Sequence, residues 1–370
     1  MKNFNLLADL VASAGVSIGT DKHNDIVIND KHAFSQAVLQ QGTLGLGESY
    51  MAGIWESEQL DDVFYKFLRA DIGGKVKPLK LLPYAIKTRL FNLQKTSRAF
   101  TVGEQHYDLG NDLYQAMLDP RMTYTCGYWQ DANNLEQAQL NKLDLICRKL
   151  KLEPGMTLLD IGCGWGSFIA YAAEHYGVKC TGCTISKQQV AWIKNKYAHL
   201  PLEFALQDYR SLEGQYDRIV SVGMFEHVGY KNFADYFKVA ERCLKDHGLF
   251  LLHTIGKHAQ TVKTDPWIDK YIFPNGYIPN MTQLVSAAEK HFVVEDLHNF
   301  GTDYDKTLTA WFNNFDQHWP QLSKRYNERF YRMWKYYLLS CAGAFRARDL
   351  QLWQWVLGKN GVANGYTRES

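Results

Sequence analysis

The fold of this chain is decided by one stretch, Leu158-Leu159-Asp160-Ile161-Gly162-Cys163-Gly164-Trp165-Gly166. Apolar residues run into an acid and then into three glycines at alternate positions, a pattern typical of a buried parallel strand that ends in a tight turn. Residues Ser167 to Tyr176 are predicted to form a helix. A strand, a glycine turn and a helix N-terminus together indicate a nucleotide-binding corner at the carboxyl end of the strand.

The spacing of the glycines distinguishes two classes of nucleotide. The dinucleotide fingerprint is G-x-G-x-x-G, but here the third glycine comes one residue early and Ser167 occupies its expected position. This spacing disfavours hydride chemistry. The form D-x-G-x-G-x-G resembles motif I of class I S-adenosylmethionine-dependent methyltransferases, in which the glycines pass under the methionine part of the cofactor. A glycine turn in another kind of α/β domain stays open on this motif alone.

Length and composition limit the remaining classes. The chain has 370 residues, enough for two domains, and its net charge of +2 gives no reason to expect nucleic-acid binding. No apolar run approaches the ~20 residues of a membrane-spanning helix, and Asp9 interrupts the short run before a signal-like Ala12-Ser13-Ala14. Seven cysteines in mostly apolar contexts indicate reduced thiols in a cytoplasmic protein. Cys180 and Cys183 are too few ligands for zinc, so no metal is expected.

One segment, from Lys66 to Arg98, is strongly basic. It carries nine lysines and arginines against the single acid Asp71. A solvated linker and a membrane-surface patch both fit this charge, because basic segments are attracted to anionic headgroups. The interleaved apolar residues, such as Leu82 and Phe91, favour docking on an anionic bilayer.

The rest of the chain is predicted to form a doubly wound α/β sheet with a small N-terminal α+β module. The predicted strands of the sheet are residues 157–161, 179–184, 202–206, 216–222 and 249–254. Residues 266–279 are interpreted as an aromatic lid or substrate wall rather than a regular element, and 324–348 as a basic, aromatic helix. The predicted domains are a lipid-positioning module (1–68), a basic linker (69–98) and a catalytic domain (99–370).

Six separated blocks resemble the family of bacterial cyclopropane-fatty-acyl-phospholipid synthases and related mycolic acid cyclopropane synthases. The blocks are Gly45–Met51, His106–Tyr114, Thr125–Trp129, Asp160–Gly166, Phe225–Gly229 and Cys341–Asp349. The resemblance implies transfer of the methyl group of S-adenosyl-L-methionine to a cis double bond of an unsaturated phospholipid acyl chain. The resulting cation loses a proton to a bound bicarbonate and closes to a cyclopropane ring. A homodimer, peripheral on the inner face of the cell membrane, is also implied.

Carried over residue by residue, the resemblance implies a bicarbonate site. Its members are Cys126, Glu226, His253, Ile255 through its backbone, and Tyr304. The strand pattern agrees for two of them, because Glu226 and His253 follow strands that end at the same rim of the sheet. Since a lone buried carboxylate is costly, we expect Glu226 to orient His253.

The cofactor site is expected along the glycine turn and the ends of the next two strands. The second strand ends without the acid that generic methyltransferases place on the ribose hydroxyls, and the resemblance suggests Thr184 and Gln189 as substitutes. Ser186 and Gln189 also have capping-box spacing, so a structural role stays open for both. The expected cofactor residues are Tyr124, Thr125, Leu158, Leu159, Asp160, Ile161, Gly162, Cys163, Gly164, Trp165, Gly166, Thr184, Ile185, Ser186, Gln189, Asp208 and Tyr209.

Two other functions remain. A fatty-acyl methyltransferase that stops before ring closure would share the cofactor residues and differ in the base and the acyl pocket. A non-enzymatic lipid-binding protein on a decayed methyltransferase fold is the second, since a fold alone does not prove chemistry. Decay would remove the glycines and the polar rim first, yet Gly162, Gly164, Gly166, Glu226 and His253 are all present.

Overall fold

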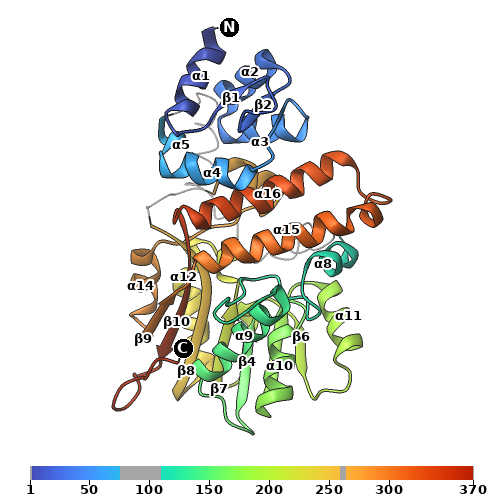
Figure 1. Ribbon diagram of the computed structural model, residues 1–370. Helices are drawn as coiled ribbons and strands as arrows, with labels where there is room; N and C mark the ends of the chain where they lie inside the picture. The colour runs from blue at the N-terminus through green and yellow to red at the C-terminus, as the bar shows by residue number, and fades with distance from the viewer. Residues whose placement is uncertain (1, 76–109, 259–263, 370) are drawn as a thin grey trace. The chain divides into compact units, whose positions relative to one another are not determined.

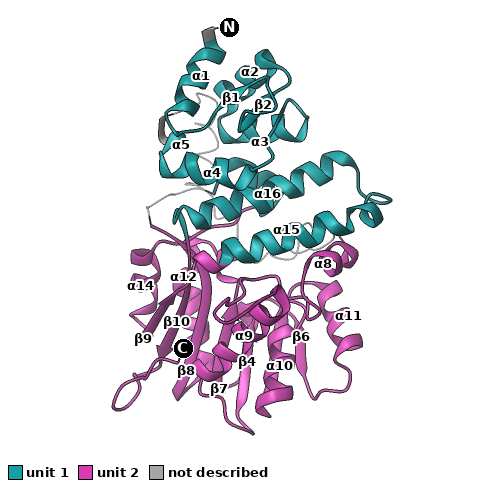
Figure 2. Ribbon diagram, in the orientation of Figure 1, with its two compact units in different colours: residues 1–92, 261–274, 304–350 teal, residues 93–260, 275–303, 351–370 magenta. Residues whose placement is uncertain are grey.

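The computed structural model describes residues 2–75, 110–258 and 264–369. Two compact units interleave along the chain (Figure 2). Unit 1 contains residues 1–92, 261–274 and 304–350, and unit 2 contains residues 93–260, 275–303 and 351–370. Most of the predicted linker lies outside the described residues, as does the first part of the block His106–Tyr114, so the division at residues 68 and 98 stays a prediction.

Unit 2 is built on a seven-stranded sheet with the strand order β6-β5-β4-β7-β8-β10-β9 (Figure 1). The strands are β4 (Thr157–Ile161), β5 (Lys179–Thr184), β6 (Glu203–Leu206), β7 (Tyr216–Val222), β8 (Leu244–Lys257), β9 (Val293–Asn299) and β10 (Leu350–Gly358). β4 pairs in parallel with both β5 and β7, β5 with β6, and β7 with β8, whereas β9 and β10 are antiparallel. The doubly wound α/β fold is therefore confirmed. Strands β9 and β10 were not predicted.

The order of the strands reverses between β4 and β7, which makes this the topological switch point of the sheet. In open α/β sheets, ligands bind outside the carboxyl ends of the strands at such a point. The predicted glycine corner follows β4 directly, so it lies where the topology itself favours a ligand.

Helices of unit 2 cover the sheet through two apolar cores. They are α8 (Asn111–Met117), α9 (Leu135–Lys149), α10 (Ser167–Tyr176), α11 (Lys187–Lys196), α12 (Phe233–Cys243) and α14 (Met281–Ala288). Alternate strand residues enter different cores, as the period of a strand requires. Leu158 and Leu251 pack with residues of α9 and α10, whereas Leu159 and Leu252 pack with residues of α12 and α14.

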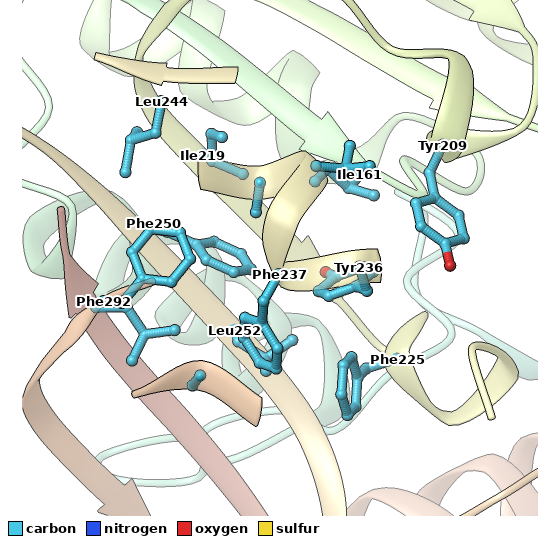
Figure 3. Packing of buried hydrophobic residues seen from close by; sticks show 14 of the residues in the cluster. Ile161, Tyr209, Ile219, Phe225, Tyr236, Phe237, Leu244, Phe250, Leu252 and Phe292 are labelled. Carbon is cyan, nitrogen blue, oxygen red and sulfur yellow. The ribbon is translucent and has the colours of Figure 1, made fainter. Parts of the chain in front are cut away.

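The α12 core is rich in aromatic rings, and Figure 3 shows several of them converging. Phe237 lies between Phe225 and Phe292, with ring centroids 5.7 Å and 6.2 Å away. Phe225 also lies 5.0 Å from Tyr236 in an edge-on arrangement. These contacts fix the segment that leaves β7, which begins with the short 3-10 helix η3 (Phe225–His227). The backbone of Glu226 is therefore held by a packed aromatic core.

Unit 1 contains a small α+β module and further helices. Its elements are α1 (Lys2–Ala12), β1 (Ile18–Gly19), β2 (Ile26–Ile28), α2 (Lys31–Gln41), α3 (Thr43–Met51), β3 (Trp55–Glu56), α4 (Leu60–Arg69), α5 (Ile72–Lys75), α13 (Pro266–Tyr271), α15 (Thr302–Leu322) and α16 (Glu328–Arg346). The predicted helix over 324–348 corresponds to α16. The prediction of no regular element over 266–279 is wrong at its start: Asp265 caps α13, with Pro266 in its first turn and Trp267 buried.

The glycine-rich signature of the module has a packing role. A Cβ atom at Gly45 would overlap the carbonyl oxygen of Ala37, and one at Gly47 would overlap the indole ring of Trp267. Both glycines lie inside α3, where glycine is otherwise unfavourable. Within the three described ranges, none of the helices combines the length and apolarity that crossing a bilayer requires.

Candidate active site

The glycine corner has the geometry that its sequence predicts. Gly162, Gly164 and Gly166 adopt positive φ values of 93°, 53° and 81°. The amide of Gly162 donates to the carbonyl oxygen of Cys183 across 3.1 Å, which ties the end of β4 to β5. A Cβ atom at Gly162 would meet Met224, and one at Gly166 would meet Ile193, but one at Gly164 would meet none of the described residues within 4 Å. The turn is therefore packed at both ends and open in the middle.

Asp160 supplies a buried acceptor next to this turn. Its side chain is 2% exposed, and Oδ1 has no hydrogen-bond partner among the residues that the structure describes. Burial raises the pKa of the Asp160 carboxyl to about 7, and the nearby Lys142 opposes that rise. A buried acceptor without a partner is costly, so the corner is suited to a ligand with a donor or a positive charge.

The residues expected at the end of β5 are brought together but bond mainly to one another. Thr184 Oγ1 donates to Gln189 Oε1 across 2.6 Å, and the Ser186 amide donates to Thr184 Oγ1 across 3.2 Å. Ser186 Oγ accepts from the Gln189 amide and caps α11. The structure thus shows the capping role of Ser186, while ribose contacts by Thr184 and Gln189 stay a prediction. Ile185, between them, is half-buried.

Asp208 and Tyr209 lie at the end of β6. Asp208 accepts from the Arg210 amide across 2.9 Å and pairs with the Arg210 guanidinium across 2.8 Å. Tyr209 is buried, and its hydroxyl has no hydrogen-bond partner within the described ranges. Burial raises the pKa of the Tyr209 hydroxyl to about 12, so it remains a neutral donor that could serve a ligand.

The loop with Tyr124 and Thr125 is anchored by buried polar side chains of α9. Lys142 Nζ donates to Thr125 Oγ1 across 2.9 Å, and Gln139 Nε2 donates to the Thr125 carbonyl oxygen across 2.8 Å. Burial lowers the pKa of the Lys142 ammonium to about 8. The Tyr124 ring lies 5.2 Å from that of Tyr114. Thr125 Oγ1 therefore accepts from Lys142 and keeps its own O–H as a donor, and contact of Thr125 with the cofactor stays a prediction.

Tyr114 also packs against the tryptophan of the glycine turn. Its ring lies 4.8 Å from that of Trp165, whose indole nitrogen donates to Asn111 Oδ1 across 3.2 Å. The loop and the glycine turn thus share one aromatic cluster, and the predicted cofactor residues from both come together.

Four of the residues predicted for the bicarbonate site belong to unit 2. Cys126 is buried and its thiol donates to the Gly127 carbonyl oxygen across 3.2 Å. Glu226 Oε1 accepts from the Ile255 amide across 2.7 Å, so the backbone of Ile255 holds the carboxylate. Glu226 Oε2 and His253 Nε2 are both buried with no hydrogen-bond partner in the part of the chain that the structure describes.

Burial shifts the pKa of both groups in the direction that disfavours charge. The pKa of the Glu226 carboxyl rises to about 7, and the Ile255 amide partly opposes the rise. The pKa of the His253 imidazole falls well below its usual value through burial, with further lowering by Lys142 and Lys149. His253 is therefore neutral near pH 7.

The expectation that Glu226 orients His253 is wrong. β7 and β8 are paired so that Val222 lies opposite His253, and the segment after β7 carries Glu226 beyond that position. The Glu226 carboxylate consequently reaches the amide of Ile255. The partner of His253 Nδ1 is instead Gln354 Nε2 of β10, 3.2 Å away.

Tyr304 belongs to unit 1, in α15. Its ring lies 4.5 Å from that of Phe345 and 6.0 Å from that of Trp311. Its membership in the bicarbonate site stays a prediction.

Sequence reasoning missed the buried polar residues that support the site. Lys142, Lys149, Gln139 and Gln354 are each at most 1% exposed. The sequence pattern could have revealed Lys142 and Lys149, because both occupy positions on the apolar face of α9 rather than on its solvent face. For Gln354 no local signal existed, since its strand was not predicted.

Comparison with known proteins identifies the family of the chain. The family model for mycolic acid cyclopropane synthetase matches residues 94–355. The cyclopropane-fatty-acyl-phospholipid synthase of Escherichia coli (strain K12) is 52% identical over 369 residues, covering 98% of this chain and 94% of that protein. A probable fatty acid methyltransferase of Pseudomonas putida is 36% identical over 274 residues, covering 70% of this chain and 69% of that protein.

Solved structures show the same fold. The cyclopropane synthase MmaA2 from Mycobacterium tuberculosis has a TM-score of 0.67 and 33% identity, covering 70% of this chain and 98% of that one. The mycolic acid cyclopropane synthase CmaA1 in complex with SAH and CTAB has a TM-score of 0.66 and 33% identity over the same shares. This chain belongs to the mycolic acid cyclopropane synthetase family and is a methyltransferase of that fold.

Proposed function

We propose that this enzyme transfers the methyl group of S-adenosyl-L-methionine to a cis double bond of an unsaturated phospholipid acyl chain and closes a cyclopropane ring. The observation that carries the proposal is the likeness to the Escherichia coli synthase, which extends over almost the whole of both chains. When bound, S-adenosyl-L-methionine supplies the methyl group and bicarbonate supplies the base.

The residues of the glycine corner fit the cofactor. The middle of the turn is open at Gly164, and Asp160 Oδ1 is a buried acceptor beside it. An ammonium group, such as that of the methionine part, would satisfy this acceptor and its charge would favour the ionised carboxylate. The N-terminus of α10, where the N-cap residue Gly166 carries no side chain, offers N–H donors to the carboxylate of the same moiety.

The two buried atoms without partners fit bicarbonate. Bicarbonate carries one O–H donor and otherwise accepts hydrogen bonds. Glu226 Oε2 is an acceptor for that O–H, and His253 Nε2, when it bears the imidazole hydrogen, is a donor for an anionic oxygen. The charges of Lys142 and Lys149, which act on His253, also favour an anion there. Cys126, which is buried in the same unit, is a further proposed member of the site. The membership of Tyr304 rests on the family resemblance.

One alternative is methyl transfer without ring closure, and the likeness to the Pseudomonas putida fatty acid methyltransferase favours considering it. An enzyme that stops before ring closure would use the same glycine corner and leave a methyl-branched or unsaturated methylated acyl chain. Mass and NMR analysis of lipids from cells that express this protein distinguishes the two products. Cyclopropane signals are expected, and methyl branches alone would contradict ring closure.

A second part of the proposal concerns the location of the enzyme and its oligomeric state. We place it peripherally on the inner face of the cell membrane, as a homodimer whose module of residues 1–68 helps to position lipid. Support at the described end of the basic segment comes from α4, where Leu68 is 37% exposed between the cations Lys66 and Arg69. Apolar and basic side chains together suit an anionic lipid surface. The dimer rests on the family resemblance.

A further inference from the structure

A chain of three buried side chains leads from α9 to His253. Lys149 Nζ lies 2.9 Å from Gln354 Oε1, and Gln354 Nε2 lies 3.2 Å from His253 Nδ1. Lys149 and Gln354 are 0% exposed, and His253 is 1% exposed. This network joins α9, β10 and β8 within unit 2.

The direction of these hydrogen bonds follows from the lysine. A protonated lysine has three donors and no acceptor, so both of its neighbours must present acceptors. Lys149 Nζ therefore donates to Gln354 Oε1 and to His298 Nδ1, which is also 2.9 Å away. With its oxygen committed to Lys149, the Gln354 amide can offer only its NH2 group to His253. Nδ1 of His253 must then accept, and the imidazole hydrogen must lie on Nε2.

We propose that Lys149 and Gln354 are positioning residues that hold neutral His253 in the Nε2–H tautomer, with its one donor free for an anion. The tautomer follows from the hydrogen-bond chain alone, whereas its effect on turnover rests on the proposed bicarbonate site. In the opposite tautomer Nε2 would carry a lone pair, and a lone pair repels an anionic oxygen.

Lys149 carries hydrogen-bond donors in both of its protonation states. Burial lowers the pKa of its ammonium to about 7, but the neutral amine still has hydrogens to donate. Its charge is favoured by Asp296 and opposed by Arg368 and Arg148. Asp296 in turn accepts from Arg368 Nε across 2.7 Å. Among the described residues, the acceptors within hydrogen-bond distance of Lys149 Nζ are Gln354 Oε1 and His298 Nδ1.

The first test is the imidazole ¹⁵N NMR spectrum of the full-length protein labelled in histidine. The His253 signals are identified by their loss in His253→Gln. We expect the pattern of a neutral ring with hydrogen on Nε2. Hydrogen on Nδ1 in the native protein would overturn the inference, whatever the enzyme's activity.

The second test uses Gln354→Glu to reverse the direction of the hydrogen bond between residue 354 and His253. A carboxylate accepts from Lys149 and also from His253, so the hydrogen should move to Nδ1. We expect kcat to fall by about 10²-fold, the loss typical of a misplaced proton, and the KM for bicarbonate to rise. S-Adenosyl-L-methionine affinity should change less than about threefold, because that site gains no clash. An unchanged tautomer in a folded Gln354→Glu protein would contradict the inference.

Tyr366→Phe is the matched control. The Tyr366 hydroxyl donates to the Lys149 carbonyl oxygen across 2.9 Å. The variant therefore disturbs the same end of α9 but leaves the hydrogen bonds among Lys149, Gln354 and His253 intact. The His253 tautomer and the KM for bicarbonate should match the native protein. If Gln354→Glu reverses the tautomer but turnover never depends on bicarbonate, the positioning inference stands and the bicarbonate proposal fails.

Discussion

The Ile255 amide donates a 2.7 Å hydrogen bond to Glu226 Oε1 and leaves Glu226 Oε2 buried, with no partner within residues 2–75, 110–258 and 264–369. One carboxylate oxygen is thus used to fix the side chain and the other is kept available. Because an unpaired buried acceptor is costly, it has to be explained by what binds there. Bicarbonate, through its O–H, is the explanation proposed here.

Glu226→Gln tests that explanation. The amide can still accept from Ile255, but it presents an NH2 group where Oε2 was, and an NH2 group cannot accept the O–H of bicarbonate. We expect turnover to fall by about 10²-fold. Affinity for S-adenosyl-L-methionine, measured by calorimetry, should stay within about threefold, since the substitution leaves the glycine corner unchanged. A loss of cofactor affinity in proportion to the rate would show that Glu226 acts on the cofactor instead.

Gly164→Ala tests the open middle of the glycine turn. Gly164 has a φ of 53°, and no residue of the described ranges lies within 4 Å of an added Cβ, so the new methyl group would occupy the space proposed for the cofactor. We expect a stability loss of roughly 1–2 kcal/mol from the left-handed backbone and a cofactor affinity lowered by more than about tenfold.

Gly155→Ala is its matched control. Gly155 has a φ of 86°, and an added Cβ there would likewise meet no residue that the structure describes, but it lies in the turn before β4. Its stability loss should be similar and its cofactor affinity unchanged. Equal affinities in the two variants, measured by calorimetry, would mean that the cofactor does not approach Gly164.

Asp160→Asn tests the buried carboxyl through the pH dependence of stability. Burial raises the pKa of Asp160 from 3.8 to about 7 in the folded protein. The protonated carboxyl therefore stabilises the fold fully below pH 3.8, and this contribution is lost as the pH rises through about 7. Asparagine does not ionise, so the variant should gain stability relative to the native protein between pH 5 and 8, by on the order of 1–3 kcal/mol.

Urea unfolding of both proteins without cofactor measures this difference. A stability difference that stays constant across the same pH range would show that Asp160 ionises at its ordinary pKa when folded.

Binding to vesicles tests the membrane proposal. The basic segment from Lys66 to Arg98 should draw the protein to anionic lipid, and the attraction should weaken in salt because the Debye length shortens to ~3 Å at 1 M. In flotation assays the bound fraction should rise with the content of anionic lipid and fall with added salt. Neutral vesicles are the control. Binding that changes with neither the anionic lipid content nor the salt concentration would contradict the proposal.

The sequence predicts the parts of this structure that depend on local patterns. The glycine turn is readable because positive φ values favour glycine, and β4 to β8 are readable because apolar runs alternate with helices. The pairing of Gln354 with His253 is not readable, since it joins residues 101 positions apart through neighbouring strands. The error over Glu226 has the same origin: a shared rim was predicted, but the register that directs Glu226 to Ile255 was not.

The buried lysines show a second limit. Lys142 and Lys149 lie at positions of α9 that the apolar period assigns to the core, where lysine is rare without a partner. Their partners come from a loop and from β10, and a helix pattern contains no information about either.

The most direct measurement uses the purified protein with vesicles of unsaturated phospholipid, S-adenosyl-L-methionine and bicarbonate, and identifies the lipid products by NMR and mass spectrometry. We expect release of S-adenosylhomocysteine matched by an equal amount of cyclopropane-containing lipid, and a loss of both when bicarbonate is removed. No release of S-adenosylhomocysteine, or release accompanied only by methyl-branched lipid, would contradict the proposed function.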